Sequence, residues 1–323
     1  MSRLPLTLGC GAYDLLRPLM DGSVVPAGID LNVLTMASPE RHGRMLRHEE
    51  FDVCELSLIA YLVALDQGRT FRAIPVFPHR RFRHSYMVKR ADAGIERPSD
   101  LNGKRVALDT LQNSAGLWMR GILQDHYGVD LKSIEWWCQE EEDVPFEPAK
   151  WMNIRRVPKG KNIDQMLVAG ELEGALYPET LPSIKNKHPR VAPLFANPKA
   201  AEIEYYKKSG IYPIMHTVVI KGHILDRHPW VAVSLLQAFQ RAKEDAYERM
   251  KDPRNSTIVW FKEAAQEQEK IFGPDPWPYS LEQNRIPLEA AIRYEHEQGM
   301  IKRKFAVEEL FFPASLQEIQ GYV

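Results

Sequence analysis

The stretch FDVCELSLIAYLVAL, residues 51–65, carries the pattern that decides the fold. It predicts a short buried strand, a turn at residues 55–57 and an apolar helix, because brief apolar runs favour strands and longer ones favour helices. The same alternation precedes it, with strands expected at LPLTLGC (4–10) and GIDLNVLTM (28–36), each followed by a helix. This β-α-β-α-β-α order is typical of an α/β lobe with a mostly parallel sheet.

A second α/β pattern occupies residues 91–214. It contains an expected strand at KRVALD (104–109) and a helix that should stop at Gly128. A strand within PIMHTVVIKGHIL (213–225) then leads into the longest helical pattern, over residues 229–250. Because 323 residues exceed the usual size of one hydrophobic core, we expect two lobes. Open α/β sheets bind ligands at their strand ends, so the expected ligand position is a cleft between the lobes.

The composition excludes several classes of protein. Lys and Arg total 42 against 43 Asp and Glu, which argues against a general nucleic-acid binder. Three cysteines, without C-x-x-C spacing, predict neither a disulfide framework nor a thiolate metal site. No apolar run approaches the ~20 residues of a membrane span, and the N-terminus does not have the pattern of a signal peptide. We therefore expect a cytoplasmic protein.

Known cofactor motifs are missing from the sequence. It has no H-E-x-x-H, no phosphate-binding G-x-x-x-x-G-K-[ST], no G-x-S-x-G and no G-x-G-x-x-G after a strand. We therefore expect no cofactor, and no spacing supports a metal site, although a metal held by scattered His, Asp and Glu residues stays open. By contrast, HRRFRHS (79–85) places five basic side chains in seven positions between two strand-like runs. Such a segment is either a solvated turn or a clamp for an anion.

Five blocks in collinear order resemble the 4,5-dihydroxyphthalate decarboxylase family. They are FDVCELSLIAYL, IPVFPHRRFRHS, LNGKRVALDTLQNSAGLWMRGIL, MHTVVIKGHIL and FGPDPWPYSLEQNR. The resemblance implies the two-lobe, type II fold of periplasmic solute-binding proteins, to which that family is similar. It also implies that the first lobe consists of residues 1–88 and 217–323, with residues 89–216 inserted as the second lobe.

The resemblance implies a lyase of aromatic compound catabolism, in phthalate degradation. Its reaction would be decarboxylation of a hydroxylated aromatic dicarboxylate, most simply 4,5-dihydroxyphthalate to 3,4-dihydroxybenzoate. Arg80 and Arg83 are the candidates to hold the substrate carboxylates, because a guanidinium binds a carboxylate bidentately, and we expect Arg81 to face solvent. His84 and His216 are the candidates for proton transfer, since histidine titrates near neutral pH. Which of the two is acid and which is base stays open, and so does a core role for His216.

Weaker candidates complete the expected site. Glu55 could orient a histidine or bind a ring hydroxyl. The other candidates could contact the substrate: Ser57, Asn113 and Ser114 near helix starts, and the aromatic residues Tyr13, Trp118 and Trp277. Helix capping explains the three polar residues equally well, and core packing explains the tryptophans. We expect a surface role for most other histidines: His42, His48, His126, His188, His223, His228 and His296.

Two further functions stay open at this stage. One is a non-catalytic receptor that delivers an aromatic acid to a transporter, and the other is a different lyase, such as a dehydratase, on the same fold. The expected partner is a small aromatic acid, not a nucleic acid or a membrane. Association into a homo-oligomer is left open.

Overall fold

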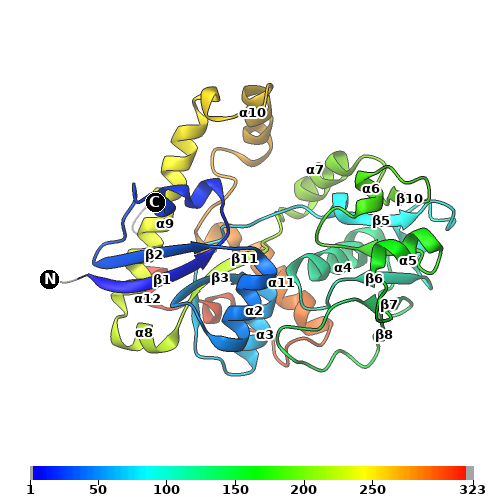
Figure 1. Cartoon of the computed structure of the whole chain (residues 1–323), viewed down its shortest axis with the longest axis horizontal. Helices are drawn as coiled ribbons and strands as arrows, with labels where there is room; N and C mark the ends of the chain where they lie inside the picture. Colours follow the sequence, from blue (N-terminus) through cyan, green and yellow to red (C-terminus); the bar gives the residue numbers. More distant parts are fainter. Residues whose placement is uncertain (1–2, 318–323) are drawn as a thin grey trace. The chain divides into compact units, whose positions relative to one another are not determined.

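The computed structural model describes residues 3–317 and divides the chain into two compact α/β units (Figure 1). The first unit consists of Met1–Arg80, His216–Leu288 and Phe305–Val323. The second consists of Arg81–Met215 and Glu289–Lys304. Lobe limits at residues 88 and 216 stay a prediction, and contacts alone group residues 81–88 and 289–304 with the second unit.

The first unit is built on a five-stranded sheet in the order β2-β1-β3-β11-β4. Its strands are β1 (Leu4–Cys10), β2 (Ile29–Thr35), β3 (Val53–Ser57), β4 (Arg72–Ile74) and β11 (His216–Ile220). Strands β1, β2 and β3 are parallel, whereas β11 runs antiparallel to both β3 and β4. The sheet is therefore mixed, because the chain returns from the second unit as β11 and enters between two earlier strands.

The turn expected at residues 55–57 was wrong. These residues are the second half of β3, and helix α3 (Leu58–Asp66) follows without a turn. The physical reason is the antiparallel partner β11, which pairs His216 with Ser57 and Val218 with Glu55 and keeps the backbone extended. Glu55 therefore lies in the middle of a fully buried strand.

Helices of the first unit follow the expected order closely. They are η1 (Asp14–Leu16), α1 (Arg17–Met20), α2 (Ser38–His48), α3, α8 (Gly222–Arg227), α9 (Trp230–Met250), η4 (Pro253–Asn255), α10 (Phe261–Phe272), η5 (Val307–Leu310) and α12 (Ala314–Gln317). Helix α11 (Leu281–Glu297) continues from the first unit into the second. Residues 58–64 of α3 are all buried, as expected for a helix that is apolar all round.

A six-stranded mixed sheet forms the second unit, in the order β10-β5-β9-β6-β7-β8. Its strands are β5 (Met87–Arg90), β6 (Arg105–Leu108), β7 (Glu135–Cys138), β8 (Asn153–Arg156), β9 (Gly174–Leu176) and β10 (Val191–Pro193). Its helices are η2 (His84–Tyr86), η3 (Pro98–Leu101), α4 (Ser114–Tyr127), α5 (Ile163–Ala169), α6 (Pro182–Lys185) and α7 (Pro198–Ser209). The predicted stop of α4 is confirmed, because Gly128 caps it with a left-handed backbone.

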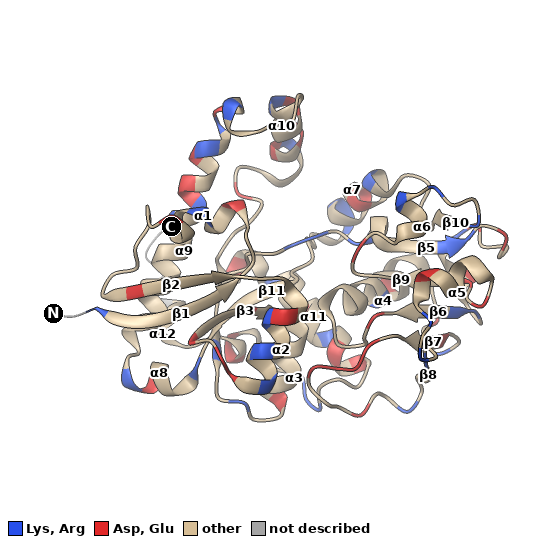
Figure 2. Ribbon diagram, viewed as in Figure 1, with Lys and Arg blue, Asp and Glu red and all other residues tan. Residues whose placement is uncertain are grey.

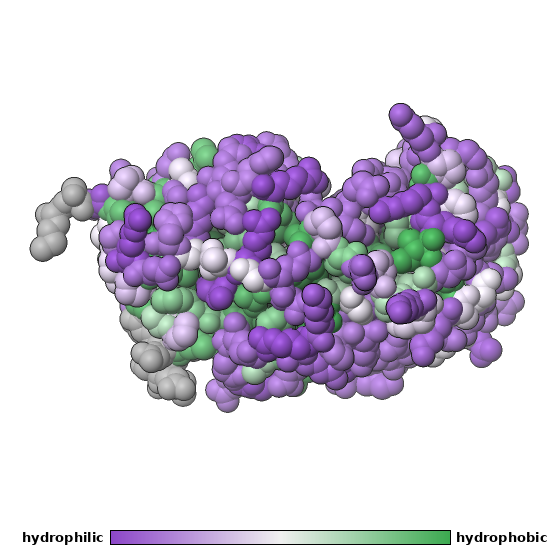
Figure 3. Space-filling view, turned by 90° about the horizontal axis from the view of Figure 1, so that it is seen from below, coloured by the Kyte–Doolittle hydropathy of each residue, from purple (hydrophilic) through white to green (hydrophobic). Residues whose placement is uncertain are grey.

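The surface is largely polar, and the charges lie on helices and loops. Figure 2 shows few charged residues on the strands of the first sheet, and Figure 3 shows a face on which hydrophilic residues predominate. Within residues 3–317, no helix is both long enough and apolar enough to cross a membrane. The few buried charged side chains, among them Arg41 and Glu55, therefore stand apart from the rest of the charged residues.

Candidate active site

Glu55 is the centre of a buried polar cluster in the first unit. Strand β3 holds its carboxylate away from solvent, with no exposed surface. Oε2 accepts a hydrogen bond from the Gly11 backbone N–H (2.7 Å), and Oε1 accepts one from the Tyr13 hydroxyl (2.8 Å). Only glycine fits at position 11, since a Cβ there would lie 2.6 Å from the Tyr13 ring. The loop after β1 is therefore shaped to bind the Glu55 carboxylate.

Arg41 neutralises this carboxylate from helix α2. Its guanidinium Nη2 lies 3.0 Å from Glu55 Oε1, and both side chains are completely buried. Nε donates to the Glu55 carbonyl oxygen (2.9 Å) and Nη1 donates to the Met36 carbonyl oxygen (2.7 Å). A buried charge is tolerated only when it is paired and hydrogen-bonded, and this ion pair meets both conditions.

Ser38, next to this ion pair, does not cap α2. It is the first helical residue, the N-cap is Ala37, and the Ser38 hydroxyl accepts a hydrogen bond from Arg41 Nη2 (3.3 Å). The Ser38 hydroxyl therefore contacts a side chain one turn further along the same helix.

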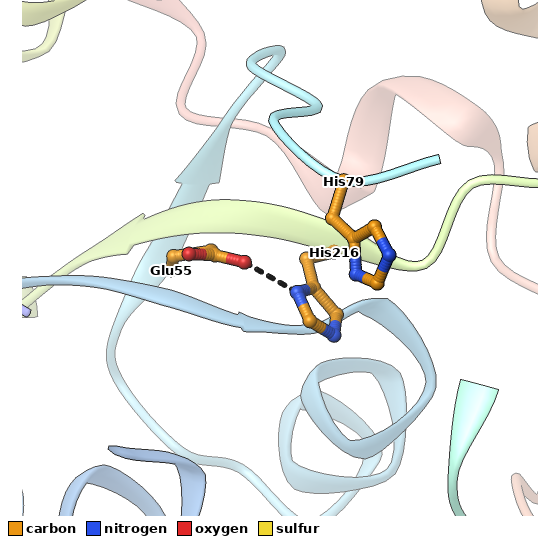
Figure 4. Close-up of side chains that lie close together, drawn as sticks. All are labelled: Glu55, His79 and His216. Atoms are coloured by element: carbon orange, nitrogen blue, oxygen red, sulfur yellow. Dashed lines mark hydrogen bonds and ion pairs between the residues drawn. The ribbon is translucent and has the colours of Figure 1, made fainter. Parts of the chain in front are cut away.

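His216 completes the cluster from the first position of β11. Its Nδ1 is hydrogen-bonded to Glu55 Oε1, and Figure 4 shows Nε2 on the side of the ring away from the carboxylate. A carboxylate accepts hydrogen bonds, so a neutral His216 carries its proton on Nδ1 and presents Nε2 as a base. The pair has the geometry of a histidine that is oriented by a carboxylate for proton transfer.

Two more imidazoles flank His216. The His79 ring packs edge-on against it, with 4.6 Å between centroids, and Tyr13 stacks on His79 at 5.6 Å. The His42 ring approaches His216 at 4.8 Å. Burial, together with the charges of His216 and Arg41, holds the pKa of His42 well below its usual range, so this ring is neutral at pH 7.

The surface role expected for His42 was wrong, because this residue is 7% exposed. Helix α2 turns its Arg41 and His42 side towards the core of the first unit. A count of charged residues along the helix could not reveal that direction. His79 was missed as well, since it was read only as one of five basic residues in the 79–85 segment.

Glu55, His79 and His216 could also hold a metal ion. One donor atom from each lies within 4.8 Å of the other two. However, Glu55 Oε1 already contacts Tyr13, Arg41 and His216, and Oε2 already accepts from Gly11. The carboxylate is thus engaged as a hydrogen-bond acceptor, and this arrangement favours acid-base chemistry over metal ligation.

The basic segment divides between the two units at Arg80. Arg80 belongs to the first unit and is 6% exposed, whereas Arg81 and Arg83 belong to the second. Arg83 donates to the Pro178 carbonyl oxygen (2.9 Å), lies against the Met215 sulfur and stacks over the Tyr86 ring. Its burial lowers its pKa to about 10. These contacts occupy much of the Arg83 guanidinium, and carboxylate binding by Arg80 or Arg83 stays a prediction.

His84 lies in an aromatic environment of the second unit. Its ring contacts Phe195 and Tyr205, and Nε2 is 3.1 Å from the Tyr127 hydroxyl. Burial, with a smaller contribution from His126, lowers the pKa of His84 to about 4. These neighbours favour a packing role for His84, and proton transfer by this residue stays a prediction.

Low pH should destabilise the fold through protonation of His84. An unfolded histidine binds its proton near pH 6.5 and His84 only near pH 4, so the unfolded state binds more protons between these values. Stability therefore falls as the pH drops through this window, by up to about 3 kcal/mol for His84. Urea unfolding at pH 7 and pH 4.5 should show a smaller loss for His84→Phe than for the native chain. The exposed control His48→Phe should lose as much as the native chain, and equal losses in all three proteins would contradict the assignment.

Of the three polar residues expected near helix starts, Ser57 and Asn113 act as caps, and Ser114 does not. The Ser57 hydroxyl accepts from the Ala60 N–H (3.3 Å), and Asn113 Oδ1 accepts from the Gly116 N–H (2.6 Å). The Ser114 hydroxyl donates to the Met215 carbonyl oxygen (2.7 Å). Substrate contact by these residues stays a prediction.

The two tryptophans occupy different environments. Trp118 is fully buried in the second unit, and its indole N–H donates to the Ile214 carbonyl oxygen (2.8 Å). Trp277 is half-buried in a loop of the first unit. The Lys243 ammonium group stabilises this loop by donating a hydrogen bond to the Trp277 carbonyl oxygen (3.0 Å). Lys243 also forms an ion pair with Asp275 at 2.5 Å. Trp118 therefore packs as a core residue does, and a stacking role for Trp277 stays a prediction.

Comparisons with known proteins agree with this architecture. Residues 14–148 match the family described as periplasmic substrate-binding proteins of phosphonate ABC transporters. The structure is similar to that of the alkanesulfonate-binding protein SsuA from Xanthomonas axonopodis pv. citri, with a TM-score of 0.57 at 10% identity. That match covers 97% of this chain and 99% of SsuA. The fold is thus the two-lobe α/β fold of periplasmic binding proteins.

Sequence relatives narrow the class further. The chain is 33% identical to a 4,5-dihydroxyphthalate decarboxylase of Comamonas testosteroni, over 99% of this chain and the whole of that protein. It is 32% identical to the protein of the same name from Pseudomonas putida, over 64% of this chain and 83% of that one. The chain belongs to the 4,5-dihydroxyphthalate decarboxylase family.

Proposed function

We propose that this protein decarboxylates a hydroxylated aromatic dicarboxylate without oxidation, most simply 4,5-dihydroxyphthalate to 3,4-dihydroxybenzoate and carbon dioxide. The observation that carries the proposal is the buried Glu55–His216 pair, in which Arg41, Tyr13 and Gly11 fix the carboxylate. Membership of a family whose full-length relative is named as a decarboxylase supports the same reaction.

The chemistry requires one proton to replace one carboxylate. A ring hydroxyl para to the leaving carboxylate gives its proton to a base and supplies electron density to the carbon that bears the carboxylate. That carbon takes a proton, the bond to the carboxylate breaks, its electron pair returns to the ring, and carbon dioxide leaves. The hydroxyl then regains its proton, so the net reaction consumes one proton.

His216 and its neighbours supply the groups for these steps. Nε2 of His216 accepts or donates the moving proton, and Glu55 fixes the ring and stabilises the imidazolium form. His79 lies against His216 and is the second candidate for proton transfer.

Arg80 is the residue that we assign to the substrate carboxylate that remains on the ring. It is a buried cation, and it has a second buried cation near it, Lys243. Burial lowers the pKa of Lys243, the ion pair with Asp275 opposes this shift, and the positive charge of Arg80 makes a smaller contribution to it. A substrate carboxylate bound at Arg80 would form charge-assisted hydrogen bonds with its guanidinium.

A non-catalytic receptor for an aromatic acid is the second candidate function. Its support is the fold, which is shared with the sulfonate-binding protein SsuA. A buried carboxylate–histidine pair is not needed for binding alone, and for this reason we place the enzyme first. Another lyase on the same fold, such as a dehydratase, would use the same pair.

The first experiment is incubation of the purified, chelator-treated protein with 4,5-dihydroxyphthalate. Carbon dioxide release and the aromatic product are followed together, the product by chromatography. One equivalent of each per substrate consumed is the expected result. No release, together with a rise in melting temperature on adding the compound, would overturn the decarboxylase assignment for this substrate and favour the receptor.

Arg80→Lys should raise KM by roughly 10-fold to 100-fold with little change in kcat, because lysine keeps the charge but loses the bidentate geometry. Steady-state kinetics with 4,5-dihydroxyphthalate measures the effect. The matched control is Arg81→Lys, since Arg81 is partly exposed and pairs with Glu179 on the surface. An unchanged KM in Arg80→Lys, or an equal rise in the control, would remove Arg80 from the site.

A further inference from the structure

Residues 248–272 form a projecting segment of the first unit, which we call the arm. It comprises the end of α9, η4 and α10. Figure 1 shows α10 and the end of α9 standing clear of the five-stranded sheet of the same unit. The active-site cluster described above includes no residue of the arm, so the reaction does not account for it.

The tip of the arm exposes large apolar side chains. Ile258, Val259 and Trp260 are 61%, 85% and 71% exposed and follow one another in the chain. Single exposed apolar residues are ordinary, whereas a contiguous group of this size marks a surface that another molecule covers.

Helix α10, which follows the tip, is only partly covered by the rest of the chain. None of its twelve residues, all of which the structure describes, is buried. One face carries an apolar stripe at helical spacing, with Phe261 near its start, Ala264 and Ala265 in its middle and Ile271 and Phe272 near its end. The large members of the stripe, Phe261, Ile271 and Phe272, are half-buried, whereas Ala264 and Ala265 are exposed. A helix of about 12 residues is marginal in water without packing on its apolar face, so the uncovered part of the stripe is available to a partner surface.

The charges on α10 identify that partner. Lys262 and Glu269 are seven residues apart, so they lie on the same flank of the stripe. If two copies of α10 pack antiparallel about a two-fold axis, this flank meets its own copy in reverse. Lys262 of each copy then lies level with Glu269 of the other, and the Phe261 end of each stripe meets the Ile271 end of the other. The surface is thus complementary to itself, as an isologous interface must be.

We propose that the arm is a dimerisation surface whose occupant is the arm of a second copy of this chain. The exposed tip residues and the α10 stripe form the apolar centre of the interface, and the Lys262–Glu269 pairs form its rim. A lipid surface is a poorer partner, because helices that bind membranes are rich in Lys and Arg. Helix α10 has two Lys and three Glu residues, and Figure 2 shows charges of both signs along it.

Sedimentation equilibrium of the purified chain at micromolar concentrations tests the proposal. The native protein should have twice the chain mass of 37.2 kDa, or a multiple of that dimer. Val259→Glu combined with Trp260→Glu should halve the mass. The matched control is Ile286→Glu, a residue that is 57% exposed and lies outside the arm; it should leave the mass unchanged.

A charge swap distinguishes the antiparallel pairing of two α10 helices from non-specific hydrophobic association of the exposed tip residues. Lys262→Glu should raise the dimer dissociation constant roughly 10-fold, because each rim pair becomes a like-charge contact. Adding Glu269→Lys to it should restore the native value, since the pair is then reversed in both copies. A monomeric native protein, a tip variant that keeps the native mass, or a double variant that stays weakened would each overturn the proposal. Circular dichroism of every variant checks that the fold is kept.

Discussion

Replacing His216 with asparagine should lower kcat by about 10²-fold to 10⁴-fold, the usual contribution of a general acid or base, while substrate binding is kept. The asparagine amide N–H stands close to the position of imidazole Nδ1 and can still donate to Glu55 Oε1. What the variant lacks is the Nε2 atom. Stopped assays of carbon dioxide release give kcat, and calorimetric titration with the aromatic acid gives the dissociation constant.

His48→Asn is the matched control for His216→Asn. His48 lies exposed at the end of α2 in the same unit, so its substitution should leave both constants unchanged. Full turnover by His216→Asn would end the assignment. If His79→Asn, and not His216→Asn, abolished turnover, the proton-transfer role would pass to His79.

Arg41→Leu should lower the free energy of unfolding by about 3–5 kcal/mol, because it leaves the Glu55 carboxylate buried without its cation. It also removes the hydrogen bonds from Arg41 to the carbonyl oxygens of Glu55 and Met36. Urea unfolding measured by circular dichroism gives the value, with the slope m showing whether the unfolding stays two-state.

The same helix provides a control for Arg41→Leu. Arg44 pairs with Glu40 and Glu50 on the surface, and surface ion pairs contribute about 0–1 kcal/mol. Arg44→Leu should therefore have a small effect. Equal losses in Arg41→Leu and Arg44→Leu would show that the buried pair does not hold the first unit together.

Local sequence signals predicted most of the secondary structure. They failed where contact with a segment distant in the sequence determines the backbone conformation. The strand at residues 4–10 and the long helix over 229–250 are confirmed within a residue. Glu55 was placed in a turn because no residue near it in the sequence indicates that β11 will pair with β3. His216, the residue of β11 that Glu55 binds, lies 161 residues further along the chain. The error concealed the most informative property of Glu55, its complete burial.

The candidate site was likewise predicted in part, and the residues that were missed are those whose orientation depends on the fold. Glu55, His216 and Tyr13 were chosen from the sequence, and the structure brings these three together. Arg41 and His79 were missed, because a helix position does not reveal which side faces the core and a basic run does not reveal which member turns inward. The reaction, the site residues and the cytoplasmic location stay predictions.

The place of β11 between β3 and β4 has a consequence for synthesis of the chain. The first unit cannot complete its sheet until His216–Ile220 emerge from the ribosome, after the main segment of the second unit. Synthesis proceeds at about 5–20 residues per second, so roughly 8–32 s pass between the synthesis of Glu55 and that of His216, its partner 161 residues further along the chain. During that interval β3 presents a hydrogen-bonding edge without its neighbour, and such edges favour aggregation. The nascent chain would therefore acquire its proton-transfer pair late, and its exposure to misfolding would be greatest just before.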